Sequence, residues 1–261
     1  MPKPKLIVTD FDGTVFSEFT TPPVPFVLQN LIQIFQSEGA QWVIATGRDM
    51  SSLMEILGRA QLLIEPDWIV LVEREIYHRV NGRFLPLEPW NTKCTETHAT
   101  LFSKIAHEIP TLAKQIQTNC KATIYSDAYS PLCIIGSDLE QAEIAFQLMQ
   151  SFASKVPNLT VVRNDVYMRF AHADYNKGTA VQQIISTLKL HPSEVFIAGD
   201  HLNDIPMLDL KYARWIAAPA NAVPAVKSTV LAQGGYVSPN PYGLGTYEAL
   251  TRCFTHSPHN M

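Results

Sequence analysis

The sequence predicts an α/β fold in which a mainly parallel sheet is interrupted by an inserted α+β segment. Short apolar runs alternate with helical patterns over residues 5–72 and again from 177 onward, which is typical of parallel sheets with crossover helices. Residues 80–172 instead show hairpin-like strand pairs and longer helices. With 261 residues the chain is long enough for two domains. We therefore expect one domain from 1–79 and 173–261, and a second from 80–172.

The first domain is expected to begin in the order βαβαβ. Three short apolar runs rich in β-branched residues predict buried strands at 5–9, 41–45 and 68–72. A helix after Pro25 has its apolar residues on one face and ends at Gly39, because glycine is common just after a helix. The next helix begins at Asp49 or Ser51, either of which can cap it, and runs to about Gly58.

The inserted segment has a different pattern. Asn81-Gly82 separates two strand-like runs and predicts a hairpin with a two-residue turn. A helix is expected over about 97–117, which Pro110 can break, and a second helix begins at Asp138, with Gln141 at capping-box spacing. Further strand-like runs complete an α+β segment: 121–125, 132–136, 159–163 and 166–170.

After the insertion the first pattern returns. A helix is expected over 177–188, and a buried strand over 195–198 ends at Gly199-Asp200. Another strand is expected over 212–217, and a loop rich in glycine and proline, 234–245, precedes the last helix.

Composition excludes several classes of partner. The net charge is −4 and the isoelectric point is about 6.1, so no broad basic surface is available for nucleic acid or anionic lipid. The four cysteines show no CxxC spacing, which indicates free thiols in a reducing compartment. The apolar run near the N-terminus is too short for a secretory signal, and no window approaches the roughly 18 apolar residues of a membrane span. We expect a cytoplasmic protein that is a monomer or a small homo-oligomer.

Polar residues follow three of the predicted strands at the point where each strand ends. Asp10, Thr46 and Asp200 occupy these positions, and Asp12 and Asp204 lie close to them in the sequence. Because the carboxyl ends of parallel strands meet at one edge of a sheet, these residues are expected to lie together although they are far apart in the chain. A single carboxylate at a strand end could equally well be a helix cap or a functional group. Helix capping is a poor explanation for the whole set of polar residues.

The clustered carboxylates require a cation, and an all-oxygen set suits Mg²⁺. Thr46, the Gly47 backbone amide and Lys177 at the start of its helix are candidate anion ligands, which together indicate a phosphate held beside the metal. A carboxylate can attack phosphorus and a second one can carry the proton, so Asp10 is the candidate nucleophile and Asp12 the candidate general acid and base. Gly13 permits a tight turn beside them. His201 is interpreted as a loop side chain rather than a metal ligand.

Four short motifs in order resemble those of the haloacid dehalogenase-like (HAD) superfamily: DFDGT at 10–14, ATGR at 45–48, NKG at 176–178 and GDHLND at 199–204. Each is weak alone, but their order and context make a strong signal. The resemblance covers about 1–75 and 176–255 and implies a Rossmann-like parallel-sheet core. It implies metal ligation by Asp10, the Asp12 carbonyl and Asp200, with Asp204 in support. It also implies phosphate contacts from Thr46 and Lys177, with Lys177 also screening the nucleophile. Asn203 is expected either to contact the phosphate or to position Asp200. Relatives that cleave carbon–halogen bonds lack the second aspartate, so Asp12 favours phosphoryl chemistry.

The position of the insertion, after Thr46 and before Lys177, resembles the C2 cap of this superfamily in its type IIB form. That subgroup includes Cof-like and sucrose-phosphate phosphatases. The segment EPDWIVLVEREIYH, 65–78, is most similar to the sucrose-phosphate branch, except that Glu73-Arg74 replace small residues and imply a different substrate if they face the cleft. Further candidate substrate residues are Arg48 in the core and Arg163, Arg169, Tyr125 and Asp127 in the cap.

The leading hypothesis is a Mg²⁺-dependent phosphatase that hydrolyses a small phosphorylated metabolite, preferably a sugar phosphate, through an aspartyl-phosphate. One alternative is a phosphosugar mutase similar to phosphomannomutases, which would return the phosphoryl group to the sugar. The other is a non-catalytic regulator that binds a sugar phosphate, which the intact Asp10 and Asp12 pair disfavours.

Overall fold

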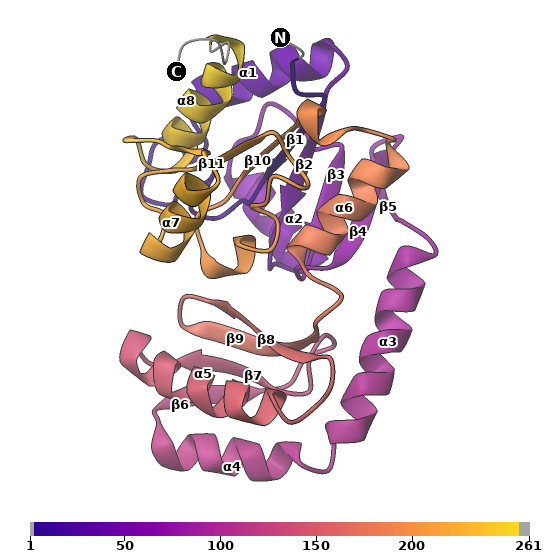
Figure 1. Cartoon of the computed structure of the whole chain (residues 1–261), viewed down its shortest axis with the longest axis vertical. Helices are drawn as coiled ribbons and strands as arrows, with labels where there is room; N and C mark the ends of the chain where they lie inside the picture. The colour runs from indigo at the N-terminus through magenta and orange to yellow at the C-terminus, as the bar shows by residue number, and fades with distance from the viewer. Residues whose placement is uncertain (1–2, 256–261) are drawn as a thin grey trace. The chain divides into compact units, whose positions relative to one another are not determined.

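A computed structural model describes residues 3–255 and divides the chain into two compact units. The first contains Met1–Leu87 and Lys177–Met261, and the second contains Glu88–Asn176. The first unit is therefore built from two stretches of sequence separated by the second unit (Figure 1).

The first unit is built on an eight-stranded sheet with the order β12-β11-β10-β1-β2-β3-β4-β5. Six of these strands are parallel, while β4 and β5 run antiparallel to their neighbours. The strands are β1 (Leu6–Thr9), β2 (Gln41–Ala45), β3 (Trp68–Leu71), β4 (Glu75–Val80), β5 (Arg83–Pro86), β10 (Val195–Ala198), β11 (Trp215–Ala218) and β12 (Tyr236–Val237). The central strand β1 is completely buried, as expected for a parallel strand covered on both faces.

Five helices accompany this sheet: α1 (Phe26–Ser37), α2 (Met50–Arg59), α6 (Lys177–Thr187), α7 (Pro224–Ala232) and α8 (Tyr242–Thr255). The helix α1 packs against α8, and α6 packs against β3 and β4. Asp49 caps α2 through a side-chain oxygen that accepts from the Ser52 backbone N–H at 2.8 Å, which is one of the two caps that the sequence predicted.

The second unit has a four-stranded antiparallel sheet in the order β6-β7-β9-β8. Its elements are α3 (Trp90–Ile105), α4 (Ile109–Asn119), β6 (Ala122–Tyr125), β7 (Cys133–Gly136), α5 (Leu139–Ala153), β8 (Leu159–Asn164) and β9 (Tyr167–His172). One apolar cluster joins its helices to one face of the sheet and includes the fully buried Met149, Met168 and Phe170. Asp138 caps α5 by accepting from the Gln141 backbone N–H at 2.9 Å.

Two features of this region differ from the sequence-based expectation. The units divide at Leu87 and Lys177 rather than at 80 and 173, because β5 pairs with β4 and so extends the sheet of the first unit. The helical stretch expected over 97–117 begins earlier, at Trp90. It is divided into two helices next to Pro110, the residue that the sequence indicated as a possible break, and Pro110 lies in the first turn of the second helix, where its missing N–H is tolerated. The predicted Asn81-Gly82 hairpin is present, with positive φ values of 51° and 74° at its two turn residues.

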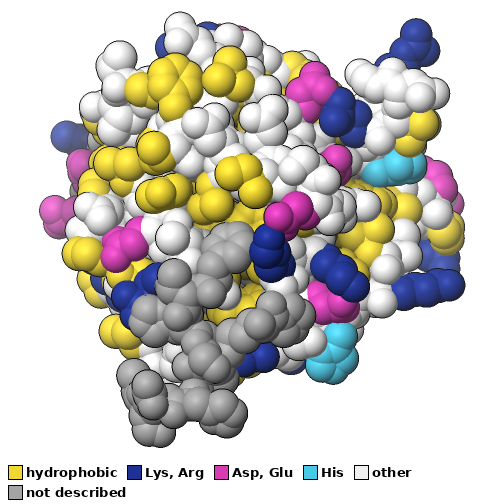
Figure 2. All heavy atoms as spheres, turned by 90° about the horizontal axis from the view of Figure 1, so that it is seen from above, with side chains coloured by type: hydrophobic (Ala, Val, Ile, Leu, Met, Phe, Trp, Pro, Cys, Tyr) yellow, Lys and Arg dark blue, Asp and Glu magenta, His cyan; other side chains and the backbone are white. Residues whose placement is uncertain are grey.

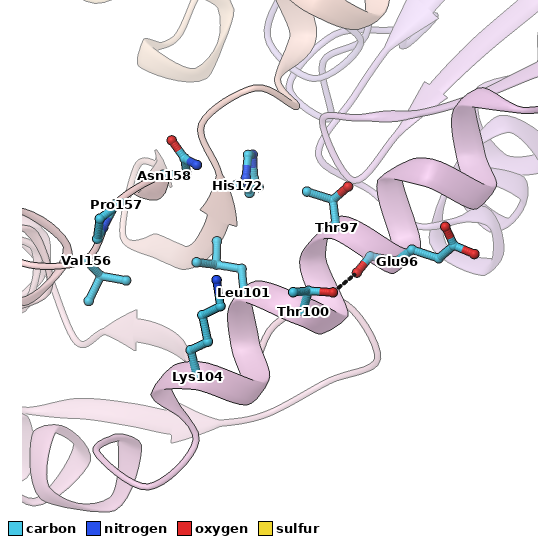
Figure 3. Close-up of a pocket in the computed structure, with 9 residues that line it drawn as sticks. All are labelled: Glu96, Thr97, Thr100, Leu101, Lys104, Val156, Pro157, Asn158 and His172. Atoms are coloured by element: carbon cyan, nitrogen blue, oxygen red, sulfur yellow. Dashed lines mark hydrogen bonds between the residues drawn. The ribbon is translucent and has the colours of Figure 1, made fainter.

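The second unit also contains a pocket of about 350 Å³, whose lining residues come from α3, the loop before β8 and the end of β9 (Figure 3). It is lined by Glu96, Thr97, Thr100, Leu101, Lys104, Val156, Pro157, Asn158 and His172, none of which belongs to the predicted phosphate site.

The surface and the cysteines agree with the composition. On the face shown in Figure 2, basic side chains are scattered among acidic and hydrophobic ones, so no continuous basic field covers it. Cys94, Cys120, Cys133 and Cys253 are buried free thiols. Within the described part of the chain, no helix is both long and apolar enough to cross a membrane.

Candidate active site

The parallel strands bring three distant segments to one edge of the sheet. Thr9 is in register with Ala198 on one side and with Ile44 on the other, so the residues that follow these strands lie next to one another. Asp10 directly follows β1, and its backbone N–H donates to the Ala198 carbonyl at 3.0 Å. The sequence-based argument from strand ends is therefore reproduced by the register of the sheet.

A tight turn after β1 sets the position of the DFDGT segment. Phe11 and Phe16 stack with ring centroids 5.1 Å apart, and both rings are buried. Gly13 has a φ of +81°, and a Cβ at this position would lie 2.3 Å from Asp200 Oδ2. Glycine is required here both for the left-handed backbone and for the close approach of the Asp200 carboxylate.

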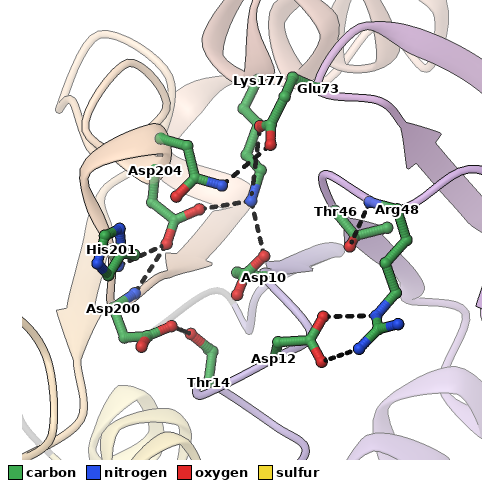
Figure 4. A network of polar contacts seen from close by, with 11 residues as sticks. Asp10, Asp12, Thr14, Thr46, Arg48, Glu73, Lys177, Asp200, His201 and Asp204 are labelled. Carbon is green, nitrogen blue, oxygen red and sulfur yellow. Dashed lines mark hydrogen bonds and ion pairs between the residues drawn. The ribbon is translucent and has the colours of Figure 1, made fainter. Parts of the chain in front are cut away.

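A buried lysine joins two of the carboxylates. Lys177, the first residue of α6, is fully buried, and its Nζ donates to Asp10 Oδ1 and Asp204 Oδ1, each at 2.6 Å (Figure 4). Burial alone would lower the pKa of Lys177, but Asp10 and Asp204 raise it well above its ordinary value. The ammonium therefore stays charged and is held directly against the predicted nucleophile.

The carboxylates outnumber this cation. Oxygen atoms of Asp10, Asp200 and Asp204 lie within 4.8 Å of one another, and all three residues are buried. Burial and then the charge of Asp204 raise the pKa of Asp10 well above its ordinary value, and the same two causes raise the pKa of Asp200 to about 7. Burial and the neighbouring negative charge thus both disfavour ionised carboxylates here, and oxygen donors of this kind fit a hard divalent cation such as Mg²⁺.

The remaining hydrogen bonds give these carboxylates different roles. Both Asp204 oxygens are engaged, because Oδ1 accepts from Lys177 and Oδ2 accepts from the backbone N–H groups of Asp200 and His201 at 2.9 Å each. Asp200 Oδ1 accepts from Thr14 Oγ1 at 2.7 Å. Asp204 thus fixes the loop that carries Asp200. Its supporting role in metal binding stays a prediction. Within the described chain, His201 is not part of any group of three possible metal ligands.

Asp12 lies apart from this buried cluster. Its carboxylate makes a bidentate pair with Arg48, whose Nε and Nη2 donate to the two oxygens at 2.8 Å each. Arg48 Nη1 also donates to Ser52 Oγ on α2 at 2.9 Å. Both side chains are about one third exposed, so the pair is accessible to solvent and to a substrate. The Asp12 carboxylate is not among the three clustered carboxylates. The metal contact from its main-chain carbonyl, which the resemblance implies, stays a prediction.

The predicted phosphate-binding residues come from three segments of the first unit: the loop after β2, the start of α6 and the short helical turn after β10. Thr46 is buried, and its Oγ1 accepts from the Arg48 backbone N–H at 3.2 Å. Asn203 is buried in the short helical turn Leu202–Asp204, and its Nδ2 donates to Glu73 Oε1 at 3.0 Å. Glu73 Oε2 lies 3.8 Å from Lys177 Nζ. The structure therefore brings Glu73 to the carboxylate cluster.

The other substrate candidates lie elsewhere. Arg74 is buried beside Glu73, and its backbone N–H donates to the Leu71 carbonyl at 2.9 Å. Arg163 and Arg169 belong to strands of the second unit, where Arg163 pairs with Glu143 on α5. The Arg169 guanidinium lies 5.7 Å from the centre of the Tyr167 ring. Contact of Arg163 or Arg169 with a substrate stays a prediction.

Sequence reasoning missed one further residue of this site. Asn221 donates from Nδ2 to the Gly13 carbonyl at 2.9 Å and to Asp200 Oδ2 at 3.3 Å, while its Oδ1 accepts from the Tyr242 N–H at 2.7 Å. It ties together the turn after β1, the loop after β10 and the start of α8. Asn221 could have been found from the sequence by its position shortly after the strand β11, because that strand ends at the same edge of the sheet.

Comparison with known proteins identifies the family. A model of the family "Sucrose-6F-phosphate phosphohydrolase" matches residues 3–251. The chain belongs to this family. One curated relative of this chain is YxeH of Bacillus subtilis, which is named as a candidate phosphatase. It is 23% identical over 259 residues, with 85% of this chain and 89% of that protein covered.

Solved structures share the fold of this protein. The sucrose-phosphatase from Synechocystis sp. PCC6803, solved in complex with sucrose and phosphate, superposes with a TM-score of 0.75 at 20% identity, covering 97% of this chain and 98% of that one. The haloacid dehalogenase-like hydrolase yhjK from Bacillus subtilis superposes with a TM-score of 0.60 at 16% identity, covering 98% and 94% of the two chains. The expected HAD fold with its additional α+β unit is thus confirmed.

Proposed function

We propose that this protein is a Mg²⁺-dependent phosphatase that hydrolyses a small phosphorylated metabolite of the sugar-phosphate class. The observation that carries the proposal is the contact between Asp10 and the buried Lys177 ammonium, with Asp200 alongside. An ammonium 2.6 Å from one Asp10 oxygen screens its charge, so a phosphate dianion can approach the carboxylate. The choice of a sugar phosphate is supported by the family and by the Synechocystis enzyme with sucrose and phosphate bound.

In this proposal the chemistry has two steps. An Asp10 oxygen attacks phosphorus, the bond from phosphorus to the ester oxygen breaks, and the Asp12 carboxyl gives its proton to that leaving oxygen. Water then attacks the aspartyl-phosphate, Asp12 takes its proton, and the bond between phosphorus and Asp10 breaks to release phosphate. The bidentate contact with Arg48 orients the Asp12 carboxylate when it accepts the proton of the water. When Asp12 carries that proton, the oxygen that holds it gives up its contact with Arg48.

Asp10, the Asp12 carbonyl and Asp200 would hold the metal, with Asp204 fixing the loop that carries Asp200. When bound, Mg²⁺ supplies positive charge that offsets the clustered carboxylates and the phosphate oxygens. Lys177, Thr46, Gly47 and Asn203 would bind the phosphate. We further propose that the second unit, Glu88–Asn176, serves as the C2B-type cap that selects the substrate, and that the protein works in the cytoplasm, as its four free thiols favour.

The proposal is tested by turnover of p-nitrophenyl phosphate and of a panel of metabolite phosphates that includes sucrose 6-phosphate. Asp10→Asn should abolish turnover and remove the phosphorylated protein seen by mass spectrometry after rapid quenching, while the circular dichroism spectrum stays unchanged. Release of free phosphate in stoichiometric amount distinguishes hydrolysis from transfer to the sugar. Wild-type activity in Asp10→Asn, or full activity in excess EDTA, would refute the mechanism.

A further inference from the structure

The residue pair after β3 adopts a backbone conformation that its side chains disfavour. Val72 and Glu73 have φ values of 46° and 72°, in the left-handed region that glycine occupies most easily. Backbone strain of this kind persists where surrounding structure enforces it and often coincides with a functional site. Here it turns the Glu73 side chain, which is only 4% exposed, into the polar cluster at the edge of the sheet.

The Glu73 carboxylate lies against three of the four residues predicted to bind phosphate. Its Oε1 accepts from Asn203 Nδ2 at 3.0 Å, and its Oε2 lies 3.8 Å from Lys177 Nζ. A Cβ placed on Gly47 would be 2.5 Å from Oε1, so the carboxylate also rests directly on that glycine. Thr46 contributes its carbonyl, which accepts the Glu73 backbone N–H at 3.1 Å.

Two buried oxygens at this point lack a hydrogen bond. Glu73 Oε2 and Asn203 Oδ1 are both inaccessible to solvent, and no donor in residues 3–255 forms a hydrogen bond with either atom. Buried polar atoms normally have partners, and their absence is costly to the folded state. The Glu73 carboxylate is therefore held by one side-chain hydrogen bond, through Oε1, and by the longer contact of Oε2 with Lys177.

We propose that the Glu73 carboxylate is an internal competitor of phosphate for Lys177, Asn203 and Gly47. This inference rests on the proposed function, which assigns these residues to phosphate. Two of the three N–H donors of Lys177 already contact Asp10 and Asp204, and Glu73 faces the ammonium as a third carboxylate. A phosphate that approached the remaining donor and Asn203 would be repelled by the Glu73 carboxylate in this buried site, so it must displace that carboxylate to bind. The Glu73 charge therefore lowers the affinity of the site for inorganic phosphate, the product, relative to the same site without this charge.

The test compares inorganic phosphate binding to wild type and to Glu73→Gln in the presence of Mg²⁺ by isothermal titration calorimetry. Glu73→Gln removes the charge and keeps the shape, so the phosphate Kd should fall by about tenfold, as expected for removing a like charge next to a bound anion. Phosphate inhibition of p-nitrophenyl phosphate turnover should tighten by a similar factor. Glu73→Gly, which also relaxes the left-handed backbone, gives the same comparison if the glutamine variant folds poorly.

Glu75→Gln is the matched control. Glu75 lies two residues along on β4, and its Oε2 accepts from Tyr77 Oη at 3.0 Å. Removing one negative charge at Glu75 should leave the phosphate Kd unchanged. A structural role for Glu73, limited to neutralising Lys177, would change stability without tightening phosphate binding, and that result overturns the inference.

The outcome also separates this inference from the proposed function. Wild-type turnover together with an unchanged phosphate Kd in both Glu73 variants overturns the inference alone. Absence of turnover in wild type, with no phosphate binding to wild type or to either variant, overturns both.

Discussion

Replacing Lys177 by methionine removes the cation at the centre of the carboxylate cluster while keeping an unbranched side chain that is one atom shorter. Lys177 Nζ contacts Asp10 and Asp204 at 2.6 Å each, and all three side chains are buried. At an effective dielectric constant near 20, each contact has a gross attraction of about 6 kcal/mol. Desolvation offsets much of this attraction, and breaking a buried pair by removing one partner typically costs about 3–5 kcal/mol. We expect a loss of that size in the free energy of unfolding.

The loss should depend on pH. Burial and the charge of Asp204 raise the pKa of Asp10 and also that of Asp200, the latter from 3.8 to about 7. The stability contributed by a carboxyl with a raised folded-state pKa is present below its unfolded value and is lost as the pH rises through the folded value. Without the ammonium, this loss becomes larger. The difference between wild type and Lys177→Met should therefore be greater at about pH 8 than at about pH 5.

Urea unfolding of metal-free protein at the two pH values measures this difference. Lys211→Met is the matched control, because Lys211 is largely exposed; its ammonium pairs with Asp209 at 3.3 Å and lies 4.6 Å from the centre of the Tyr212 ring. Its effect should stay within about 0.5 kcal/mol, as for most surface substitutions. If Lys177→Met were as stable as Lys211→Met at the higher pH, or lost the same amount at both, the account of Lys177 as the compensating charge would be refuted.

Three further predictions concern the metal site and the core. In wild-type protein, Mg²⁺ should raise the thermal midpoint more at about pH 8 than at about pH 5, because Asp200 with a pKa of about 7 must lose its proton to bind the ion; an equal rise at both values would contradict this. Gly13→Ala and Gly39→Ala both place a Cβ on a left-handed backbone, but only at Gly13 does it meet Asp200, so calorimetry should show weaker Mg²⁺ binding for the first variant alone. Phe170→Ala in the second unit should cost about 3–5 kcal/mol by urea unfolding, against less than about 1 kcal/mol for Ile135→Ala, which is exposed on the same sheet.

The edge of the sheet that holds the site could be predicted from sequence because the carboxyl ends of all strands in a parallel sheet lie at the same edge. Apolar runs that end in Asp10, Thr46 and Asp200 are visible in the sequence, and the sheet brings these ends together. The same reasoning could not assign β5 to a unit. A hairpin is encoded locally by Asn81-Gly82, but which sheet it extends depends on pairing between distant strands.

Side-chain partners at the site were less predictable. Glu73 stood out as an unexpected residue, but its direction follows from a left-handed backbone that no periodic pattern indicates. The pair of Arg48 with Asp12 depends on how a long side chain crosses between two loops. Asn221 acts through three hydrogen bonds to segments that are distant in sequence. Such contacts come from tertiary structure, which spacing alone does not specify.

The order of strands along the chain also constrains how the molecule is assembled during synthesis. All four strands of the second unit lie between residues 122 and 172, whereas β1 at the centre of the larger sheet needs β10, which begins at Val195. A nascent chain therefore carries every strand of the inserted unit while one edge of the apolar strand β1 still lacks its neighbour. Translation that stops before Val195 leaves that edge open to other chains, so truncated products of this protein should aggregate rather than persist as soluble half-sheets.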